Sequence, residues 1–312
     1  MVPVFTGSHL ERAVSPERAV EAVRDAFVAY ARGEWTMPPK VYVTNYPAGD
    51  FRAMPALGGD FAMLKWINSF PGNPALGLPT VSGLVLLSDA ESGQLRAVFD
   101  AASVTALRTG AAAVLAAEVL GRSDARSAAV IGAGVNGQAV ARTFVARGRD
   151  VVLWDIDEAR ALAAAEALGA TVAPSLAEAL ASDIVVTVTP GHEVLLAEGT
   201  LSSGQHVSLM GADGPGKAEA AGAELARCRL FCDDWEQASH GGEFAHAVEA
   251  GLVGREAVTQ LGDVLTGAAG GRSSDDEITA FDSTGLAIQD LAIAIAAFEQ
   301  AGELADLGRL EL

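Results

Sequence analysis

The sequence predicts an α/β protein with two domains, and three observations support this prediction. A length of 312 residues, half of them hydrophobic, is enough to bury a large core and is typical of two domains. From residue 127 to about 233, short apolar runs alternate with helical segments, which predicts a parallel sheet covered by helices on both faces. Residues 40–98 instead contain β-rich pieces separated by Pro, Gly, Asn and Asp, which predicts an antiparallel sheet.

Composition argues against several classes of protein. The formal net charge of −19 repels phosphate backbones and anionic membranes, so neither nucleic acid nor a membrane is expected as a partner. No basic leader segment opens the chain, and no run approaches the roughly 18 uninterrupted apolar residues of a membrane span, so a cytoplasmic location is expected. The two cysteines, Cys228 and Cys232, are too few for a disulfide framework or a zinc site and are expected to be buried thiols.

Helices are expected before and after the antiparallel sheet region along the chain. Residues 16–32 follow a Ser-Pro start and repeat apolar side chains at helical spacing, as at Val20, Val23 and Phe27, so they predict a helix that docks on the core. Residues 101–120 predict a long Ala-rich helix, with a domain boundary directly after it.

The last part of the chain is expected to be helical. Residues 271–279, GRSSDDEIT, are typical of an N-cap and an acidic first turn. Residues 283–300 then predict the final helix, which is apolar except where Gln289 and Asp290 interrupt it. Those two polar residues favour a buried helix over a membrane helix.

A glycine pattern follows the strand expected at residues 127–131 and opens a helix. Gly132 allows a tight turn, Gly134 lets the backbone approach a pyrophosphate, and Gly137 lets the helix pack closely on the strand. The helix N-terminus adds free N–H groups and a positive dipole end. The pattern therefore predicts a Rossmann-type, doubly wound dinucleotide-binding domain; a glycine-rich turn without a cofactor is the alternative. The turn residues expected to bind the cofactor are Gly132, Ala133, Gly134, Val135, Asn136 and Gly137.

Further cofactor contacts are expected at other strand ends. Asp155 ends the next strand, where an acid accepts hydrogen bonds from the adenosine ribose and repels a 2′-phosphate. NAD is therefore favoured, and NADP stays possible because Arg160 is close in the sequence. Thr187 and Thr189 end a later strand at the carboxyl edge of the sheet, and with Thr109 they complete the expected cofactor-binding set.

Asp213 lies in the segment GADGPGK, directly after another strand of the same sheet. Glycine and proline constrain the backbone, so such a loop directs one side chain toward a site, although the same residues are also usual in a surface turn. The position at the carboxyl end of a strand, on the side where a nicotinamide would lie, favours a catalytic role for Asp213.

Three cations in the first domain are candidates for binding a substrate carboxylate. Arg52 and Arg108 offer the two-bond fork that suits a carboxylate, and the alternative is a structural Asp or Glu partner. Lys65 lies in the apolar strand FAMLKWI, where burial would lower its pKa toward a range useful for acid–base work. An outward-pointing lysine on an edge strand is the alternative for Lys65.

A metal site is not expected. The segment 240–249 contains two histidines and two glutamates, but the histidines are six residues apart and two glycines interrupt any helix between them. The residues considered are His240, Glu243, His246 and Glu249.

Several segments together resemble the ornithine cyclodeaminase/mu-crystallin family, and within it most closely the archaeal-type alanine dehydrogenase branch. The similarity runs from about Met37 to Phe298, and the segments GADGPGK and FDSTGLAIQD are specific. The other segments that carry it are GDFRAMPAL, LPTVSGLVLLSD, ALRTGAA, GAGVNG and DDWEQASHGGE.

The resemblance implies a nicotinamide-binding domain joined to a substrate-binding and dimerisation domain, whose sheets pair in a homodimer and to which the last helix returns. The domains are then expected at residues 121–294 and at residues 1–120 with 295–312. The resemblance also implies that Arg108 binds the substrate carboxylate, that Lys65 contacts the substrate and that Asp213 is the catalytic acid.

Arg52 bears on the reaction that the resemblance implies. Cyclodeaminases of this family carry Glu two residues before a Met-Pro pair, where this chain has Arg52 before Met54 and Pro55. An arginine suits a short monocarboxylic substrate, so an NAD-dependent L-alanine dehydrogenase is expected. The alternatives are a ketimine or cyclic imine reductase, an ornithine cyclodeaminase and a nucleotide-binding protein without turnover.

Overall fold

The protein is described by a computed structural model, which covers residues 1–191, 193–214 and 216–311, and internal contacts divide the chain into two compact units. Unit 1 contains Met1–Arg108 and Leu286–Leu312, and unit 2 contains Thr109–Gly285. This division falls inside the helix α3 (Ala101–Leu120), whereas the sequence places a domain boundary at its end.

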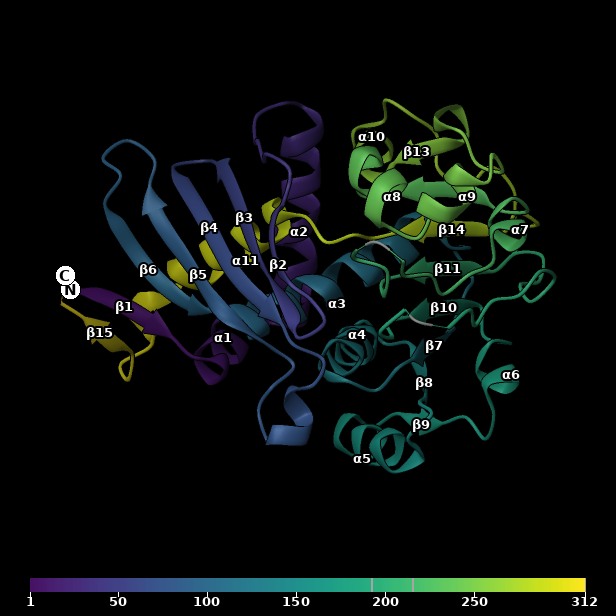
Figure 1. Ribbon diagram of the computed structural model, residues 1–312, viewed down its shortest axis with the longest axis horizontal. Helices are drawn as coiled ribbons and strands as arrows, with labels where there is room; N and C mark the ends of the chain where they lie inside the picture. The colour runs from purple at the N-terminus through teal and green to yellow at the C-terminus, as the bar shows by residue number, and fades with distance from the viewer. Residues whose placement is uncertain (192, 215, 312) are drawn as a thin grey trace. The chain divides into compact units, whose positions relative to one another are not determined.

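Unit 1 is built on a mixed seven-stranded sheet in the order β15-β1-β6-β5-β4-β3-β2 (Figure 1). The strands β2 to β6 pair antiparallel with their sequence neighbours, as the sequence predicts for residues 40–98. The strand β1 adds a parallel pairing with β6 and an antiparallel one with β15. The strands are β1 (Val2–Phe5), β2 (Val41–Asn45), β3 (Gly49–Gly58), β4 (Phe61–Ser69), β5 (Val81–Asp89), β6 (Leu95–Asp100) and β15 (Gly308–Leu310).

One face of this sheet is covered by the helix α11 (Ala287–Glu299), which contacts β3, β4 and β5 (Figure 1). The helix α2 (Pro16–Ala31) packs on α11, so the predicted docking helix is confirmed. Its start follows the sequence signal, because Pro16 is in the first turn and the Ser15 side chain accepts a hydrogen bond from Arg18 N at 3.2 Å. Shorter helical segments of unit 1 are α1 (Gly7–Ala13), η1 (Asn73–Leu76) and η3 (Ala301–Glu303).

The prediction for residues 271–279 is wrong. These residues form a loop that leads into the strand β14 (Thr279–Asp282), and α11 begins later, at Ala287, than the expected Ser283. The reason is tertiary, because β14 lies between two parallel strands in the middle of the second sheet and buries all four of its residues there. The free energy gained by this burial outweighs the local preference for a helix.

Unit 2 contains an eight-stranded sheet in the order β13-β12-β14-β11-β10-β7-β8-β9, and every pairing in it is parallel (Figure 1). The α/β fold class is thereby confirmed, with a Rossmann-like sheet in one unit and a mixed sheet in the other. Cys232 is buried in this sheet, whereas Cys228 is only partly buried. The other strands are β7 (Ser127–Ile131), β8 (Asp150–Trp154), β9 (Thr171–Val172), β10 (Ile184–Thr187), β11 (His206–Leu209), β12 (Arg229–Cys232) and β13 (Val258–Gln260).

The helices of unit 2 connect these strands. The helix α4 follows the glycine turn, and α5 follows the strand β8, as the alternation in the sequence predicts. They are α4 (Val135–Ala146), α5 (Glu158–Leu168), α6 (Leu176–Ala179), α7 (Gly222–Leu225), α8 (Trp235–Gly241), α9 (Ala245–Glu249), η2 (Arg255–Ala257) and α10 (Leu261–Thr266).

Among the described residues, α3 is the one helix long and apolar enough to cross a membrane by length and composition alone. Its most apolar window is 67% buried inside the protein, and it carries Arg108 and Glu118. Such burial within the protein is typical of a core helix.

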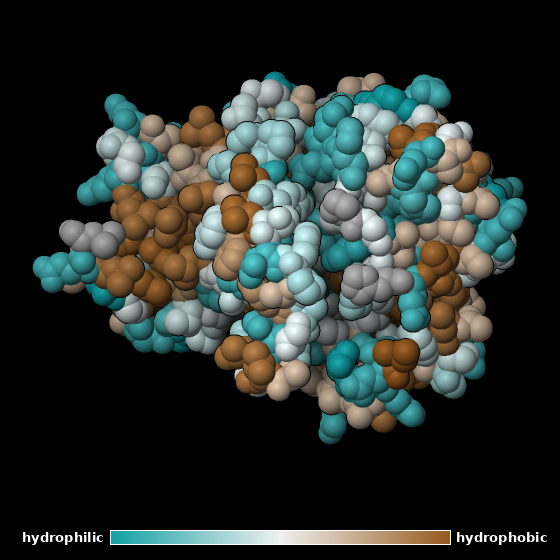
Figure 2. Space-filling view, viewed as in Figure 1, coloured by the Kyte–Doolittle hydropathy of each residue, from teal (hydrophilic) through white to brown (hydrophobic). Residues whose placement is uncertain are grey.

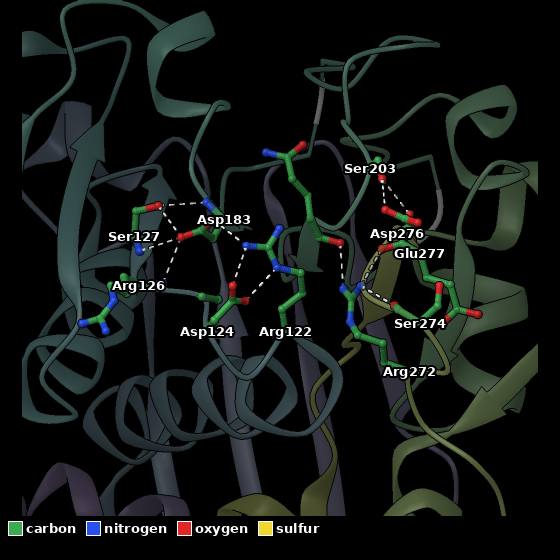
Figure 3. Close-up of polar contacts among 12 residues, drawn as sticks. Arg122, Asp124, Arg126, Ser127, Asp183, Ser203, Arg272, Ser274, Asp276 and Glu277 are labelled. Carbon is green, nitrogen blue, oxygen red and sulfur yellow. Dashed lines mark hydrogen bonds and ion pairs between the residues drawn. The ribbon is translucent and has the colours of Figure 1, made fainter.

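Polar side chains tie segments together at the amino ends of the strands of unit 2 (Figure 3). Asp183 Oδ2 accepts hydrogen bonds from the N–H groups of Arg126 and Ser127 at 2.9 and 3.1 Å, and the Arg126 N–H holds the pKa of Asp183 below its ordinary value. Arg272 donates to the carbonyl oxygen of Leu120, the last residue of α3, at 2.8 Å and to three further carbonyl oxygens. These contacts stabilise the amino edge of the sheet, which is opposite to the edge where its parallel strands end.

Candidate functional site

The carboxyl edge of the unit 2 sheet brings the predicted cofactor residues together. The strand β7 lies between β8, which follows it in the chain, and β10, so the strand order reverses at this point. Ligands of open α/β sheets bind outside the carboxyl ends of the strands at such a switch point. The glycine turn follows β7, Asp155 follows β8, and Thr187 ends β10, so all three lie at that edge.

The glycine turn has the geometry that a dinucleotide needs. Gly132 has φ +107°, a conformation that residues with a side chain rarely adopt, and a Cβ on Gly137 would overlap the carbonyl oxygen of Gly132. A Cβ on Gly134 would meet no heavy atom within 4 Å, so there is room for a pyrophosphate against the backbone. The helix α4 begins after Gly134 with no side-chain cap, which leaves its first N–H groups for a phosphate. These residues fit a bound dinucleotide.

Asp155 is fixed beside this turn. Its Oδ2 accepts a hydrogen bond from Ala133 N at 2.7 Å, and its Oδ1 accepts one from Asp157 N at 2.9 Å. Arg160 lies 3.5 Å from Oδ1 on the exposed surface of α5. A carboxylate held at this point repels the 2′-phosphate of NADP, which favours NAD. Arg160 is the cation nearest to Asp155 in the sequence, and a 2′-phosphate would need such a partner.

The two predicted threonines, Thr187 and Thr189, donate to Glu219, a carboxylate that is not predicted from the sequence. Thr187 and Thr189 each donate a side-chain hydrogen bond to Glu219 at 2.7 Å, and Thr187 is fully buried. Thr109 is also buried, and its Oγ1 has no hydrogen-bond partner among the residues that the structure describes. The side chain of Thr187 therefore positions the loop rather than facing a ligand.

Asp213 follows β11 at the same carboxyl edge. Its side chain is 34% exposed, and its Oδ1 accepts a hydrogen bond from Lys217 Nζ at 2.6 Å. A carboxylate that solvent can reach is able to exchange a proton with water.

Other carboxylates at this edge are deeply buried. Burial raises the pKa of Glu243 to about 8, and it also raises the pKa values of Glu219 and Asp282. Glu243 accepts hydrogen bonds from the N–H groups of Glu219 and Ala220 at 2.8 and 2.7 Å, so it holds the segment after the Asp213 loop.

The acidic and histidine side chains of residues 240–249 do not converge. Glu243 is engaged with backbone N–H groups, His240 Nδ1 lies 2.8 Å from the carbonyl oxygen of Glu236, and neither ring nitrogen of His246 has a hydrogen-bond partner in the described part of the chain. Within residues 1–191, 193–214 and 216–311, no group of three or more His, Cys, Asp and Glu is placed to hold a metal ion.

Unit 1 places Lys65 in a buried ion pair. The strand β4 lies inside the sheet, and the Lys65 side chain is 1% exposed, so the alternative of an outward-pointing edge lysine is wrong. Lys65 Nζ donates to Asp290 Oδ1 on α11 at 2.9 Å, and Arg108 Nε lies 3.5 Å from the same oxygen. Asp290 is thus the shared partner of two predicted substrate-binding cations.

The pKa of Lys65 should lie well below that of an ordinary lysine. Burial lowers its pKa from 10.5 to about 8, Asp290 opposes this shift, and Arg108 and Lys40 add to it. Because the unfolded chain holds this proton more tightly, the free energy of unfolding should rise with pH between about 8 and 10.5, by ~3 kcal/mol from this group alone. Carbon-13 NMR of the lysine side chains measures this pKa directly. The chain has only three lysines, so the Lys65 signal can be assigned as the one that Lys65→Arg removes. A midpoint at 10.5 would contradict the burial of the ammonium.

Arg52 lies on the same face of the sheet as Lys65. The register pairs Met54 with Lys65 and Arg52 with Ile67, and residues opposite each other share a face. Arg52 Nε donates to Asp50 Oδ1 at 2.6 Å, and its guanidinium lies 5.4 Å from the ring centroid of Tyr42. The structure therefore brings the cations Arg52, Lys65 and Arg108 into one unit with two carboxylates, Asp50 and Asp290.

Asp290 and Glu219 are the main residues that the sequence reading did not assign to the site. Asp290 gives a signal in the sequence, because it is an acid within an apolar helix, a place where a charge usually needs a partner. Glu219 gives none, because it follows a glycine-rich loop in which an exposed acid is ordinary.

The fold and the carboxyl edge of unit 2 define a dinucleotide-binding protein of the Rossmann type. Unit 1 adds one buried cation, Lys65, and two partly buried ones, Arg52 and Arg108. The chain belongs to the ornithine cyclodeaminase/mu-crystallin family, whose sequence model matches residues 4–304, so the resemblance found in the sequence is confirmed.

Relatives support this assignment over nearly the whole chain. An alanine dehydrogenase from Archaeoglobus fulgidus is 42% identical over 308 residues, which are 96% of this chain and 94% of that protein. The solved structure of an archaeal alanine dehydrogenase dimer with bound NAD has a TM-score of 0.92 and 39% identity, and covers 99% of both chains. Δ1-pyrroline-2-carboxylate reductase of Thermococcus litoralis, solved with NADH and L-proline, has a TM-score of 0.93 and 27% identity over 99% of this chain and 100% of that chain.

Proposed function

We propose that this chain is an L-alanine dehydrogenase that converts L-alanine, NAD and water into pyruvate, ammonia and NADH. The coarser part of this proposal is an NAD-dependent oxidoreductase that acts on the carbon–nitrogen bond of amino acids or imines. Support for it comes from the glycine turn, which fits a dinucleotide, and from the bound NAD or NADH of two structural relatives. Support for alanine comes from the 42% identity to the Archaeoglobus enzyme.

The observation that carries the choice of substrate is Arg52. It lies on the face of β3 that α11 covers. Its Nε donates a hydrogen bond to Asp50 at 2.6 Å, and its side chain is 13% exposed. A partly buried guanidinium at this point favours a carboxylate and disfavours the distal ammonium of a diamino acid such as ornithine. A small monocarboxylic amino acid therefore suits this face better than a cyclodeaminase substrate.

The proposal gives each unit a separate task. Arg52 and Arg108 bind and orient the substrate carboxylate, and Lys65, whose pKa is about 8, donates a hydrogen bond to it or exchanges a proton with it. When bound, NAD accepts the α-hydrogen of the substrate as hydride. Asp213 takes a proton from the water that attacks the resulting imine carbon and returns it as the carbon–nitrogen bond breaks, so that ammonia leaves and pyruvate remains.

A second candidate function is the reduction of an imine. The Thermococcus reductase shares the fold at a TM-score of 0.93, and its solved complex holds NADH and L-proline. Reduction of a cyclic imine uses the same hydride transfer in the opposite direction but has no water attack, so Asp213 would then protonate or orient the nitrogen only.

The deciding experiment follows NADH absorbance with purified protein across a panel of substrates. We expect NADH to form from NAD with L-alanine, more slowly with NADP, and to be consumed with pyruvate plus ammonia. Consumption of NADH with Δ1-pyrroline-2-carboxylate alone would support the reductase. Proline made from L-ornithine without net NADH would support a cyclodeaminase and contradict the role of Arg52.

The proposal includes a homodimer and the cytoplasmic location expected from the sequence. The face of the unit 1 sheet opposite to Lys65 exposes large apolar side chains, and Figure 2 shows hydrophobic residues gathered over the strands of this unit. We expect sedimentation velocity to give twice the chain mass at micromolar concentration; a monomer would contradict the dimer. The exposed residues on β2, β4 and β5 are Val41, Val43, Leu64, Trp66 and Leu84.

A further inference from the structure

Glu219 is a fully buried carboxylate with four hydrogen-bond donors. Its Oε1 accepts from the backbone N–H of Thr189 at 2.9 Å and from the Thr189 hydroxyl at 2.7 Å. Its Oε2 accepts from the Thr187 hydroxyl at 2.7 Å and from Gly211 N at 2.9 Å. These donors come from the end of β10, from the loop after it and from the loop after β11. One side chain therefore joins both loops at the carboxyl edge.

The surroundings of Glu219 fix its place. A Cβ on Gly211 would lie 2.5 Å from the Glu219 carboxyl carbon, so the carboxylate fills the space that any side chain at residue 211 would need. The backbone N–H groups of Glu219 and Ala220 donate in turn to Glu243, which is itself buried. The loop that carries Asp213 is thus held at Gly211 before it and at Glu219 after it.

We propose that Glu219 is a positioning residue, which sets the arrangement of Thr189 and of the Asp213 loop and thereby the affinity for the nicotinamide cofactor and the turnover. The proposal rests on the proposed function for the catalytic role of Asp213. Glu219 acts through Thr189 and Gly211 and needs no contact with the substrate. Because Glu219 accepts hydrogen bonds from Thr189 in the loop after β10 and from Gly211 in the loop after β11, its loss frees both loops at once.

Glu224 offers a matched control in the same unit. It is also fully buried, and it accepts hydrogen bonds from Gly199 N at 2.7 Å and Leu201 N at 2.6 Å. It pairs with Arg227 at 2.6 Å, and within the described part of the chain it has no hydrogen bond or ion pair with a predicted cofactor residue. Glu224→Gln therefore removes a loop-fixing carboxylate of the same kind without a link to the site.

The test compares Glu219→Gln with Glu224→Gln in two measurements: NADH affinity by fluorescence titration, and kcat and KM with L-alanine. An amide places an NH2 group against N–H and O–H donors, so both variants should melt at lower temperature than the wild type. For Glu219→Gln we expect NADH affinity to fall by about tenfold and kcat by about 10²-fold, since small misplacements of a catalytic constellation have effects of this size. For Glu224→Gln both values should stay within about twofold of the wild type.

A double-variant cycle with Thr189→Val shows whether Glu219 acts through the threonine. If it does, Glu219→Gln combined with Thr189→Val should lose less kcat/KM than the product of the two single losses. Independent, multiplicative losses would overturn the proposal. So would a Glu219→Gln variant that melts early but keeps wild-type NADH affinity.

Two further outcomes are separable. If Glu219→Gln does not fold, Thr187→Val and Thr189→Val remove the donors and leave the carboxylate, and wild-type NADH affinity in both would overturn the proposal. If the wild type binds NADH but oxidises no amino acid, the proposed function fails, and the NADH affinities of the Glu219 and Glu224 variants still decide the role of Glu219.

Discussion

Replacing Asp213 with asparagine should lower kcat for L-alanine by roughly 10²–10⁴-fold while the variant folds and binds NADH like the wild type. Asparagine keeps the shape of the side chain but cannot take a proton from water. The side chain is 34% exposed, so no buried charge is left unpaired, and the lost contact with Lys217 at 2.6 Å should cost less than about 1 kcal/mol. Steady-state kinetics by NADH absorbance and an NADH fluorescence titration measure the two effects separately.

Asp183→Asn is the matched control for this prediction. Asp183 lies at the opposite, amino edge of the same sheet, where it accepts backbone hydrogen bonds from Arg126 and Ser127 (Figure 3). This substitution should lower stability more than Asp213→Asn does, because it weakens those bonds, yet it should leave kcat unchanged. A kcat within about threefold of the wild type for Asp213→Asn would remove Asp213 from the proposed chemistry.

The parts of the fold that follow from local patterns could be predicted from the sequence. Unit 2 alternates strand and helix with the glycine turn after β7, and the strands β7, β8, β10, β11 and β12 appear in the sequence as short apolar runs. The strand β14 could not be predicted in this way, because its neighbours β11 and β12 lie far from it in the chain. The acidic residues before it, Asp275 and Asp276, give a local signal for a helix that the sheet overrides.

In the candidate site too, residues could be predicted from their own segments, whereas their partners from distant parts of the chain could not. Lys65 and Arg108 stand out in the sequence because charges in apolar segments need partners. Their partner could not be assigned, since Asp290 is 225 residues from Lys65 along the chain. Glu219 was missed for a related reason: its role depends on donors from two loops, and only the sheet register brings those loops to one carboxylate.

Replacing Asp290 with alanine should destabilise the protein by about 3 kcal/mol at pH 7, the lower end of the range for breaking a buried ion pair. The substitution leaves the Lys65 ammonium, 1% exposed, and the Arg108 guanidinium without the carboxylate that they share at 2.9 and 3.5 Å. The loss stays at the lower end because Lys65 already has a pKa of about 8 and can release its proton. Denaturant unfolding of wild type and variant measures the difference in the free energy of unfolding.

Asp306→Ala is the control, because Asp306 pairs with Arg12 at 2.8 Å in the same unit but on the exposed surface, where solvent screens the ion pair and its loss should change stability little. The destabilisation by Asp290→Ala should shrink at pH 9, above the pKa of Lys65, since a neutral amine leaves less unpaired charge in the core. Adding Lys65→Met should restore part of the lost stability for the same reason. A loss that neither pH nor Lys65→Met reduces would mean that the cavity left by the side chain, rather than the unpaired ammonium, destabilises the variant.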